Sequence, residues 1–388
     1  MVSSVNTKME TEKVLFKILV SEVNGVPLSA GNNDFDKPEL FSLAEKHDLI
    51  HLVADALIKN GSVDKDDPDY KKLKKEVLSA IYRDSRRTEA FEKISEIFER
   101  EKILYVPMKG LIVKELYPES WMRTSCDLDI LIREEDLDRA TEALVKDGFT
   151  TDGVKNYHDR HFYYDRSHLE LHFNICEGDP KLDALLKRAF EFVSRKEGFR
   201  FEESNEFFAF HHIAHTAYHF MAGGCGIRPV LDLYILRQNE FYDENGLIAL
   251  LNECGLVDFY KTLCDLSEVW FGNGEHSSIT ERAEEYILCG GVYGTVSNGT
   301  KIGLAKNRNR VKYIFKLAFL PYEQMRSIYP SLEKHKILLP FCYIHRIFSK
   351  LFGKGRERVK NRIDRIMNSP NDSIDAAETL LNDLGLKQ

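Results

Sequence analysis

TSCDLDILI, residues 124–132, decides the fold, because it sets two carboxylates into a short apolar segment that is typical of a buried strand. Asp127 and Asp129 lie two positions apart, and side chains two apart on a strand point to the same face of the sheet. Two such carboxylates repel one another, and leaving them uncompensated on a half-buried strand is costly. A divalent cation between them removes that cost, so the pattern indicates a metal site.

A second predicted strand carries another carboxylate. HLELHFN, residues 168–174, puts Glu170 and His172 on one face and apolar side chains on the other. The longer stretch 161–174 predicts a hairpin that turns at 165–167. If this strand neighbours the one that holds the aspartates, all three carboxylates face one cleft. They then supply the oxygen ligands that a hard cation prefers.

Upstream of both lies ILYVPMKG, residues 103–110, which predicts a strand and a Lys-Gly turn, with a helix from about 111 to 117. Glycine at such a turn lets a ligand approach the backbone, and the free N–H groups at a helix start attract phosphate. Lys109 would add a positive charge to that site. The pattern also suits a plain strand-to-helix turn, and the downstream aspartates are what favour the phosphate interpretation.

The order of these segments resembles the nucleotidyltransferase superfamily with the DNA polymerase β-like fold. More narrowly, it is similar to a bacterial family usually described simply as nucleotidyltransferases, with an LKG-type turn, an R-x-x-x-D-x-D strand and an ELHW-type strand. The matching segments here are MKG (108–110), RTSCDLD (123–129) and LELHF (169–173). The superfamily's more common turn is Gly-Gly or Gly-Ser, whereas the Lys-Gly turn matches the narrower family. Weaker similarity extends to residues 40–53, 211–219 and 228–236.

The resemblance implies an enzyme that moves a nucleoside monophosphate from an NTP, with ATP as the first candidate, to an acceptor hydroxyl while pyrophosphate leaves. It implies two Mg²⁺ or Mn²⁺ ions, which Asp127 and Asp129 would hold together. Glu170 would ligate the ion nearer the acceptor hydroxyl or act as its base. The sequence does not determine the acceptor, which could be a small molecule, a protein or RNA.

The resemblance also implies a set of nucleotide-binding residues. Lys109, the Gly110 backbone and Arg123 would neutralise the triphosphate. The other implied contacts are His172 beside Glu170, and His215, Arg228 and Asp232 of the later helical region, which would line or brace the cleft. A purely structural role for the last three is an equally open alternative.

Two other activities fit the same residues. The metal site would also serve nucleotide hydrolysis. A catalytically silent core could instead bind a nucleotide or a partner protein without turnover. Three converging carboxylates favour an enzyme over the silent module, because binding alone does not require them.

Composition narrows the class of protein. The chain has 388 residues, 43% hydrophobic and 30% charged, as expected for a soluble protein with a full core. The net charge is −8, which argues against a positive electrostatic potential over the whole surface of the kind that attracts nucleic acid. The seven cysteines are scattered without a Cys-x-x-Cys pair, which indicates reduced thiols. With no signal-peptide core at the start and no apolar run of about 18–20 residues, we expect a cytoplasmic protein without a membrane span.

Helical periodicity surrounds the central segment. Residues 1–100 predict a helical region, with periodic stretches at 15–23, 40–60 and 70–101. Residues 101–177 alternate strand, helix, strand, helix and hairpin, which is the order of a minimal nucleotidyltransferase core. Residues 178–388 return to helical patterns. We therefore predict an α+β fold, in which a small mixed sheet carries the site between N- and C-terminal helical regions.

Three further stretches leave alternatives open. FFAFHHIAHTAYHFM, residues 207–221, places three histidines at helical spacing, which invites a zinc interpretation, but no HExxH motif or cysteine accompanies them. GGVYGTVSNGT, residues 290–300, matches no phosphate-loop motif and favours a flexible loop. The basic stretches 301–316 and 354–365 suit either solvated helix faces or contacts to an anionic acceptor.

Overall fold

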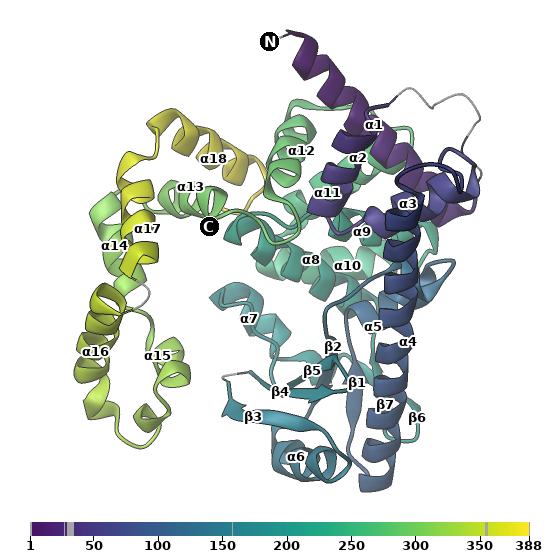
Figure 1. Ribbon diagram of the computed structural model, residues 1–388. Coiled ribbons are helices and arrows are strands. Elements are labelled where there is room, and N and C mark those ends of the chain that lie inside the picture. The colour runs from purple at the N-terminus through teal and green to yellow at the C-terminus, as the bar shows by residue number, and fades with distance from the viewer. Residues whose placement is uncertain (1, 27, 29–34, 157, 354–355, 388) are drawn as a thin grey trace.

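The computed structural model, which describes residues 2–26, 28, 35–156, 158–353 and 356–387, contains a seven-stranded mixed sheet that lies below the helical body in Figure 1. The strand order is β3-β4-β5-β2-β1-β7-β6. The strands are β1 (Tyr105–Pro107), β2 (Leu128–Ile132), β3 (Thr150–Lys155), β4 (Asp159–Tyr164), β5 (Ser167–His172), β6 (Val193–Glu197) and β7 (Arg200–Glu203). Helices flank this sheet, so the predicted α+β class is confirmed.

The two strands that carry the carboxylates are neighbours. β2 pairs with β5 in parallel, and Asp129 lies opposite Glu170 in the register. The hairpin of β4 and β5 turns at Asp165 and Arg166, whose φ angles are 43° and 66°. Two successive positive φ angles give the type I′ geometry that matches the twist of a two-residue hairpin. The turn thus places β4 beside β5, whereas the parallel pairing of β5 with β2 joins strands about 40 residues apart.

The sheet is larger than the sequence indicated. β3 precedes the hairpin, and β6 and β7 lie beyond residue 178, where only helices were expected. β7 joins the sheet in parallel with β1, and the Tyr105 N–H donates to the Phe199 carbonyl over 3.1 Å. The sequences VSRKE and RFEE of β6 and β7 are mostly polar and partly exposed, so apolar alternation does not mark them as strands.

Helices α4 (Tyr70–Glu101) and α6 (Leu137–Lys146) cover the apolar face of the sheet. Ile94 and Phe98 of α4 and Leu144 of α6 are fully buried together with Ile130 of β2. α4 matches the predicted helix 70–101, and α6 forms most of the predicted helix 134–147. Because side chains alternate along β2, burying Ile130 on this side turns Asp129 to the opposite face.

The opposite face meets the helical body. N-terminal helices α1 (Val2–Asn24), α2 (Lys37–Lys46) and α3 (Ile50–Lys59) share one hydrophobic core with the helices that follow the sheet. Those helices are α7 (Pro180–Leu186), α8 (Asn205–Ala222), α9 (Arg228–Gln238), α10 (Glu244–Cys254), α11 (Val257–Phe271), α12 (Ser278–Gly290) and α13 (Val296–Lys306). A break at 47–49 splits the predicted helix 40–60 into α2 and α3.

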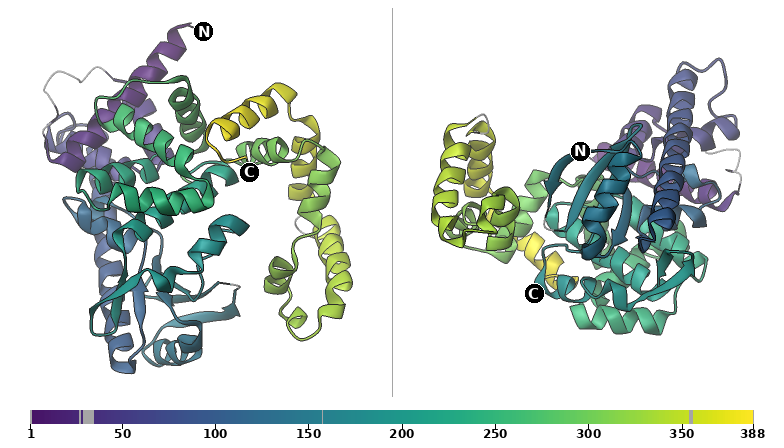
Figure 2. Two further views of the ribbon diagram at one scale, coloured as in Figure 1. Left: turned by 180° about the vertical axis from the view of Figure 1, so that it is seen from behind. Right: turned by 90° about the horizontal axis from the view of Figure 1, so that it is seen from below.

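The last helices form an arm that extends beside the body (Figures 1 and 2). It consists of α14 (Arg310–Ala318), α15 (Tyr322–Ile328), α16 (Leu339–Phe352) and α17 (Arg356–Asn368). The chain then returns through α18 (Asn371–Asp383), which packs on α13 and α12. Within the described residues, no helix combines the length and the apolar character that crossing a membrane requires.

Candidate functional site

A cavity of about 370 Å³ separates the polar face of the sheet from helices α8 and α9. Nine of the ten predicted site residues line it: Lys109, Gly110, Arg123, Asp127, Asp129, Glu170, His215, Arg228 and Asp232. The tenth, His172, lines an adjoining cavity of about 200 Å³. Residues scattered over more than 120 positions of sequence therefore border one space, because the sheet and the helical body meet there.

The three carboxylates share this cavity. Asp129 on β2 and Glu170 on β5 lie side by side in the strand register. Asp127 immediately precedes β2, and its carboxylate accepts a hydrogen bond from the Ser125 hydroxyl over 3.1 Å. All three carboxylates therefore border one cavity, and Asp129 and Glu170 also belong to a group whose ligand atoms lie within 4.8 Å of one another.

Asp129 is the best-compensated carboxylate of the three. It is 5% exposed, and its Oδ1 accepts hydrogen bonds from Lys109 Nζ and His172 Nε2, both over 2.9 Å. Burial by itself would raise the pKa of Asp129, but the charge of Lys109 and the contacts with His172 hold it well below the usual range. These contacts therefore favour the ionised form of Asp129.

Glu170 has the opposite electrostatic environment. Burial, followed by the charges of Asp129 and Asp127, raises its pKa to about 7. Ligand atoms of Asp129, Glu170 and His172 all lie within 4.8 Å of one another, which is a spacing that one ion can bridge. Crowded carboxylate oxygens suit a hard divalent cation, and such an ion would relieve the repulsion at Glu170. The residues present thus fit the implied metal.

The Lys-Gly turn has an unusual backbone. Lys109 adopts φ 49° and ψ −120°, which directs the chain sharply into the four-residue helix α5 (Gly110–Val113). A 3-10 turn at Lys114–Leu116 follows, in place of one continuous helix to 117. A Cβ on Gly110 would lie 3.3 Å from the Ser125 side chain. Glycine therefore allows the turn to pack closely against the loop before β2.

Arg123 and Asp232 form a buried brace. Arg123 Nε and Nη2 donate to the Asp232 carboxylate over 2.8 to 3.0 Å, and the Tyr117 hydroxyl donates to the same group over 2.8 Å. Asp232 is fully buried, which alone would raise its pKa, but Arg123 and Tyr117 bring that pKa below the usual value. The pair ties the loop before β2 to α9, so Arg123 is engaged within the protein while it borders the cavity.

Arg228, the first residue of α9, links that helix to the segment between α2 and α3. Its guanidinium forms an ion pair with Asp48 at the break between α2 and α3. Asp48 also accepts a hydrogen bond from the Thr124 hydroxyl over 3.1 Å. One side of Arg228 still borders the cavity, together with Tyr293 of the glycine-rich segment. That segment packs tightly: the Thr295 N–H donates to the Gly223 carbonyl over 3.1 Å.

The histidines of α8 do not converge as a metal set within the described part of the chain. His215 Nδ1 instead lies 2.7 Å from Glu177 Oε1, and His215 Nε2 lies 3.1 Å from His219 Nε2. Burial would raise the pKa of Glu177, but His215 and Lys109 lower it to about 2. The sequence analysis did not single out Glu177. Its only signal is its position five residues after His172, which is the last residue of the strand that carries Glu170.

The described basic residues of the two C-terminal stretches that we considered for acceptor binding do not line this cavity, and Lys354 lies outside the described residues. Arg308 forms ion pairs with Asp375 and Glu378 of α18. Arg310 donates to the Ser369 carbonyl over 2.7 Å and so caps the end of α17. Both arginines therefore stabilise the packing between helices, and neither borders the cavity.

Comparison with known proteins identifies the family. Residues 33–272, which are more than half of the chain and include every residue of the cavity up to Asp232, match the family model of the uncharacterised nucleotidyltransferases. No curated protein and no solved structure is significantly similar to the chain. The match agrees with the narrower resemblance of the MKG, RTSCDLD and LELHF segments. The chain belongs to the uncharacterised nucleotidyltransferase family.

Proposed function

We propose that the protein transfers a nucleoside monophosphate from an NTP, with ATP as the first candidate, to the hydroxyl of an acceptor. One observation carries the proposal: Asp129 and Glu170 lie in register on neighbouring strands, and Asp127 borders the same cavity. A volume of about 370 Å³ falls within the range of small-molecule sites. An NTP donor is consistent with a cytoplasmic location.

Asp127, Asp129 and Glu170 would hold two Mg²⁺ or Mn²⁺ ions. Such ions, when bound, stabilise the negative charge on the attacking and leaving oxygens of an in-line displacement. Glu170 faces the cavity and is positioned to ligate an ion or to accept the proton of the acceptor hydroxyl. Asp129 stays ionised because Lys109 and His172 compensate it.

Lys109 has two alternative partners in this proposal. Its ammonium group pairs with Asp129, and its side chain is 24% exposed and lines the cavity. A bound cation would take over the compensation of Asp129, which frees Lys109 to contact the triphosphate. Arg123, Arg228 and Asp232 then act mainly as braces that fix the cleft, because each is held by a partner within the protein.

The Lys109–Asp129 ion pair also supports a second candidate, a silent module that binds a nucleotide or a partner protein. An ammonium group that already neutralises the key aspartate makes a metal dispensable for stability. The first candidate remains preferred, since Lys109 does not compensate Glu170 enough to bring its pKa down to the ordinary range.

Both candidates are tested with NTPs labelled at the α-phosphate, Mg²⁺ or Mn²⁺, and fractions of a cell extract as the source of acceptor. Transfer of label to an acceptor with release of pyrophosphate, lost in Asp129→Asn, supports the transferase. Label on the protein itself would indicate self-modification or a protein acceptor. Release of inorganic phosphate indicates hydrolysis, and stable binding without any release indicates the silent module.

A further inference from the structure

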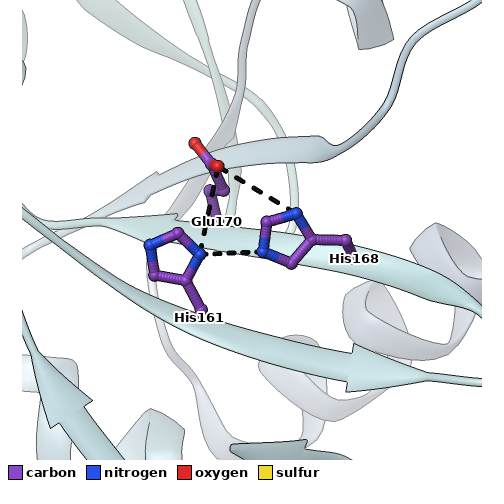
Figure 3. A group of neighbouring side chains, drawn as sticks. All are labelled: His161, His168 and Glu170. Carbon is purple, nitrogen blue, oxygen red and sulfur yellow. Dashed lines mark hydrogen bonds and ion pairs between the residues drawn. The ribbon is translucent and has the colours of Figure 1, made fainter. Parts of the chain in front are cut away.

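Two histidines extend the row of carboxylates across the sheet. His161 on β4 lies opposite Glu170 on β5, which in turn lies opposite Asp129. His168 precedes Glu170 by two positions and shares its face. His161 Nδ1 lies 2.8 Å from His168 Nε2, and Glu170 Oε1 lies 3.9 Å from His161 Nδ1 and 4.0 Å from His168 Nδ1 (Figure 3). Neither histidine lines the cavity of the proposed transferase site.

Neighbouring groups fix both imidazole rings. The second nitrogen of His161, Nε2, lies 3.2 Å from Oδ1 of Asp159, which is 4% exposed. Asp159 is itself held by Asn156 Nδ2 over 2.6 Å. Tyr163 stacks on His168 with ring centroids 4.9 Å apart. A histidine whose second nitrogen meets a buried carboxylate is the arrangement that orients metal-binding imidazoles in proteins.

We propose that His161, His168 and Glu170 bind a divalent transition-metal ion of the Zn²⁺ type, at a site that shares Glu170 with the proposed transferase site and differs from it in having two imidazole ligands. Two imidazoles and one carboxylate suit such an ion, whereas Mg²⁺ prefers oxygen. Zinc bonds of about 2.0–2.2 Å place tetrahedral ligand atoms roughly 3.3 Å apart. One ligand atom from each of the three side chains lies within 4.8 Å of the other two, so rotation of the side chains suffices to reach that spacing. The three side chains are partly exposed, so the fourth coordination position of the metal would be open to solvent.

The test uses Co²⁺ as a spectroscopic probe and Zn²⁺ in calorimetry, with the full chain and no nucleotide. We expect wild type to bind one Co²⁺ with tetrahedral absorption, and the double variant His161→Ala/His168→Ala to bind at least ten-fold more weakly. His276→Ala, an exposed histidine between α11 and α12, is the matched control and should bind as wild type. Asp159→Asn should weaken binding about 10–100-fold, as removal of an orienting carboxylate does.

Asp129→Asn separates this site from the transferase site, because it removes an oxygen ligand of that site and leaves both histidines in place. It should keep the Co²⁺ spectrum even if the proposed transferase reaction fails. Unchanged Co²⁺ affinity in the double variant would overturn the proposal. So would a wild type without Co²⁺ absorption, in which case the three side chains form only a hydrogen-bonded cluster.

The arm α14–α17 carries a second, independent inference from its charge and its apolar surface. Residues 310–368 contain 14 Lys and Arg against 4 Asp and Glu, although the whole chain has a net charge of −8. Of the twenty large apolar side chains that the described structure leaves exposed, eleven lie on this arm. The arm is thus both strongly basic and unusually apolar on its surface.

The exposed apolar side chains follow helical stripes. On α16 they are Phe341, Ile344, Phe348, Leu351 and Phe352, and on α14 and the residue that follows it they are Val311, Phe315 and Phe319. Spacings of three and four residues place each set on one face of its helix. Arg346 of α16 donates to the Ala318 carbonyl at the end of α14 over 2.7 Å. The two helices are therefore held together at that point.

We propose that this arm docks on the surface of an anionic phospholipid bilayer. Basic amphipathic helices bury their apolar face at the headgroup boundary while Lys and Arg contact anionic headgroups. A second copy of the chain is a poorer occupant, because two arms of the same strong charge repel each other. RNA would satisfy the charges but not the exposed aliphatic side chains such as Ile344 and Leu351.

Sedimentation with vesicles tests the docking. Vesicles that contain phosphatidylglycerol should bind the full chain, and pure phosphatidylcholine vesicles should bind it at least ten-fold more weakly. Phe348→Asp/Phe352→Asp should lose binding at least ten-fold, whereas Leu78→Asp/Tyr82→Asp, at two exposed apolar positions of α4, should not. Equal binding by the Phe348/Phe352 variant would overturn the proposal. A concentration-dependent dimer or an RNA complex that this variant abolishes, without vesicle binding by wild type, would do the same.

Discussion

Arg123→Met is expected to destabilise the protein strongly, because Arg123 is the main partner of a carboxylate that solvent does not reach. Asp232 is fully buried and receives hydrogen bonds from two nitrogens of Arg123 and from the Tyr117 hydroxyl. Removing the guanidinium leaves the Asp232 carboxylate with only the hydrogen bond from the Tyr117 hydroxyl among these three. Breaking a buried ion pair from one side costs about 3–5 kcal/mol, so we expect the free energy of unfolding to fall by about that amount.

Urea unfolding followed by circular dichroism measures this change. Arg308→Met is the control, because its ion pairs are exposed and should contribute at most about 1 kcal/mol. The double variant Arg123→Met/Asp232→Leu should recover part of the loss, since it removes both charges. The Arg123→Met variant should also retain its unfolding slope if the denatured state is unchanged.

A different outcome would refute the interpretation of Arg123 as a brace. If Arg123→Met lowered the free energy of unfolding by less than about 1 kcal/mol while it weakened NTP binding ten-fold, its main role would be the phosphate contact that the family resemblance implies.

Three further predictions follow from the site and its surroundings. Asp129→Asn should abolish metal-dependent pyrophosphate release while circular dichroism stays unchanged; retained release would exclude Asp129 as a ligand. Lys109→Ala should raise the KM for NTP about ten-fold or more, as loss of one charged hydrogen bond does. It should also lower the melting temperature of the metal-free protein, with recovery in Mg²⁺, and an unchanged KM would contradict this role. Burial lowers the pKa of His51 to about 4, whereas the ordinary pKa is about 6.5. The neutral ring therefore contributes to the free energy of unfolding above pH 6.5. That contribution, about 3 kcal/mol at most, is lost as the pH falls towards 4. Urea midpoints measured between pH 7 and pH 4 should fall less in His51→Gln than in wild type, and parallel curves would contradict the assignment.

The sequence by itself determined the part of the fold that depends on local pattern. Alternation marked β2 and β5 and set Asp129 and Glu170 on the faces that they occupy, because side-chain direction repeats every two residues. Helical spacing over 70–101 marked α4 almost to the residue. The polar strands β6 and β7 carried no such pattern, and their place in the sheet is decided by the pairing of β7 with β1 and of β6 with β7.

Only the tertiary structure decided which side chains hold one another. Asp232 lies 109 residues from Arg123, and Glu177 lies 38 residues from His215, so nothing in the local sequence couples either pair. The packing of α8 and α9 against the polar face of the sheet brings them together. Burial then makes each charge require its partner, which is why Arg123 is held by Asp232 while it borders the cavity. Its contact with the triphosphate stays a prediction.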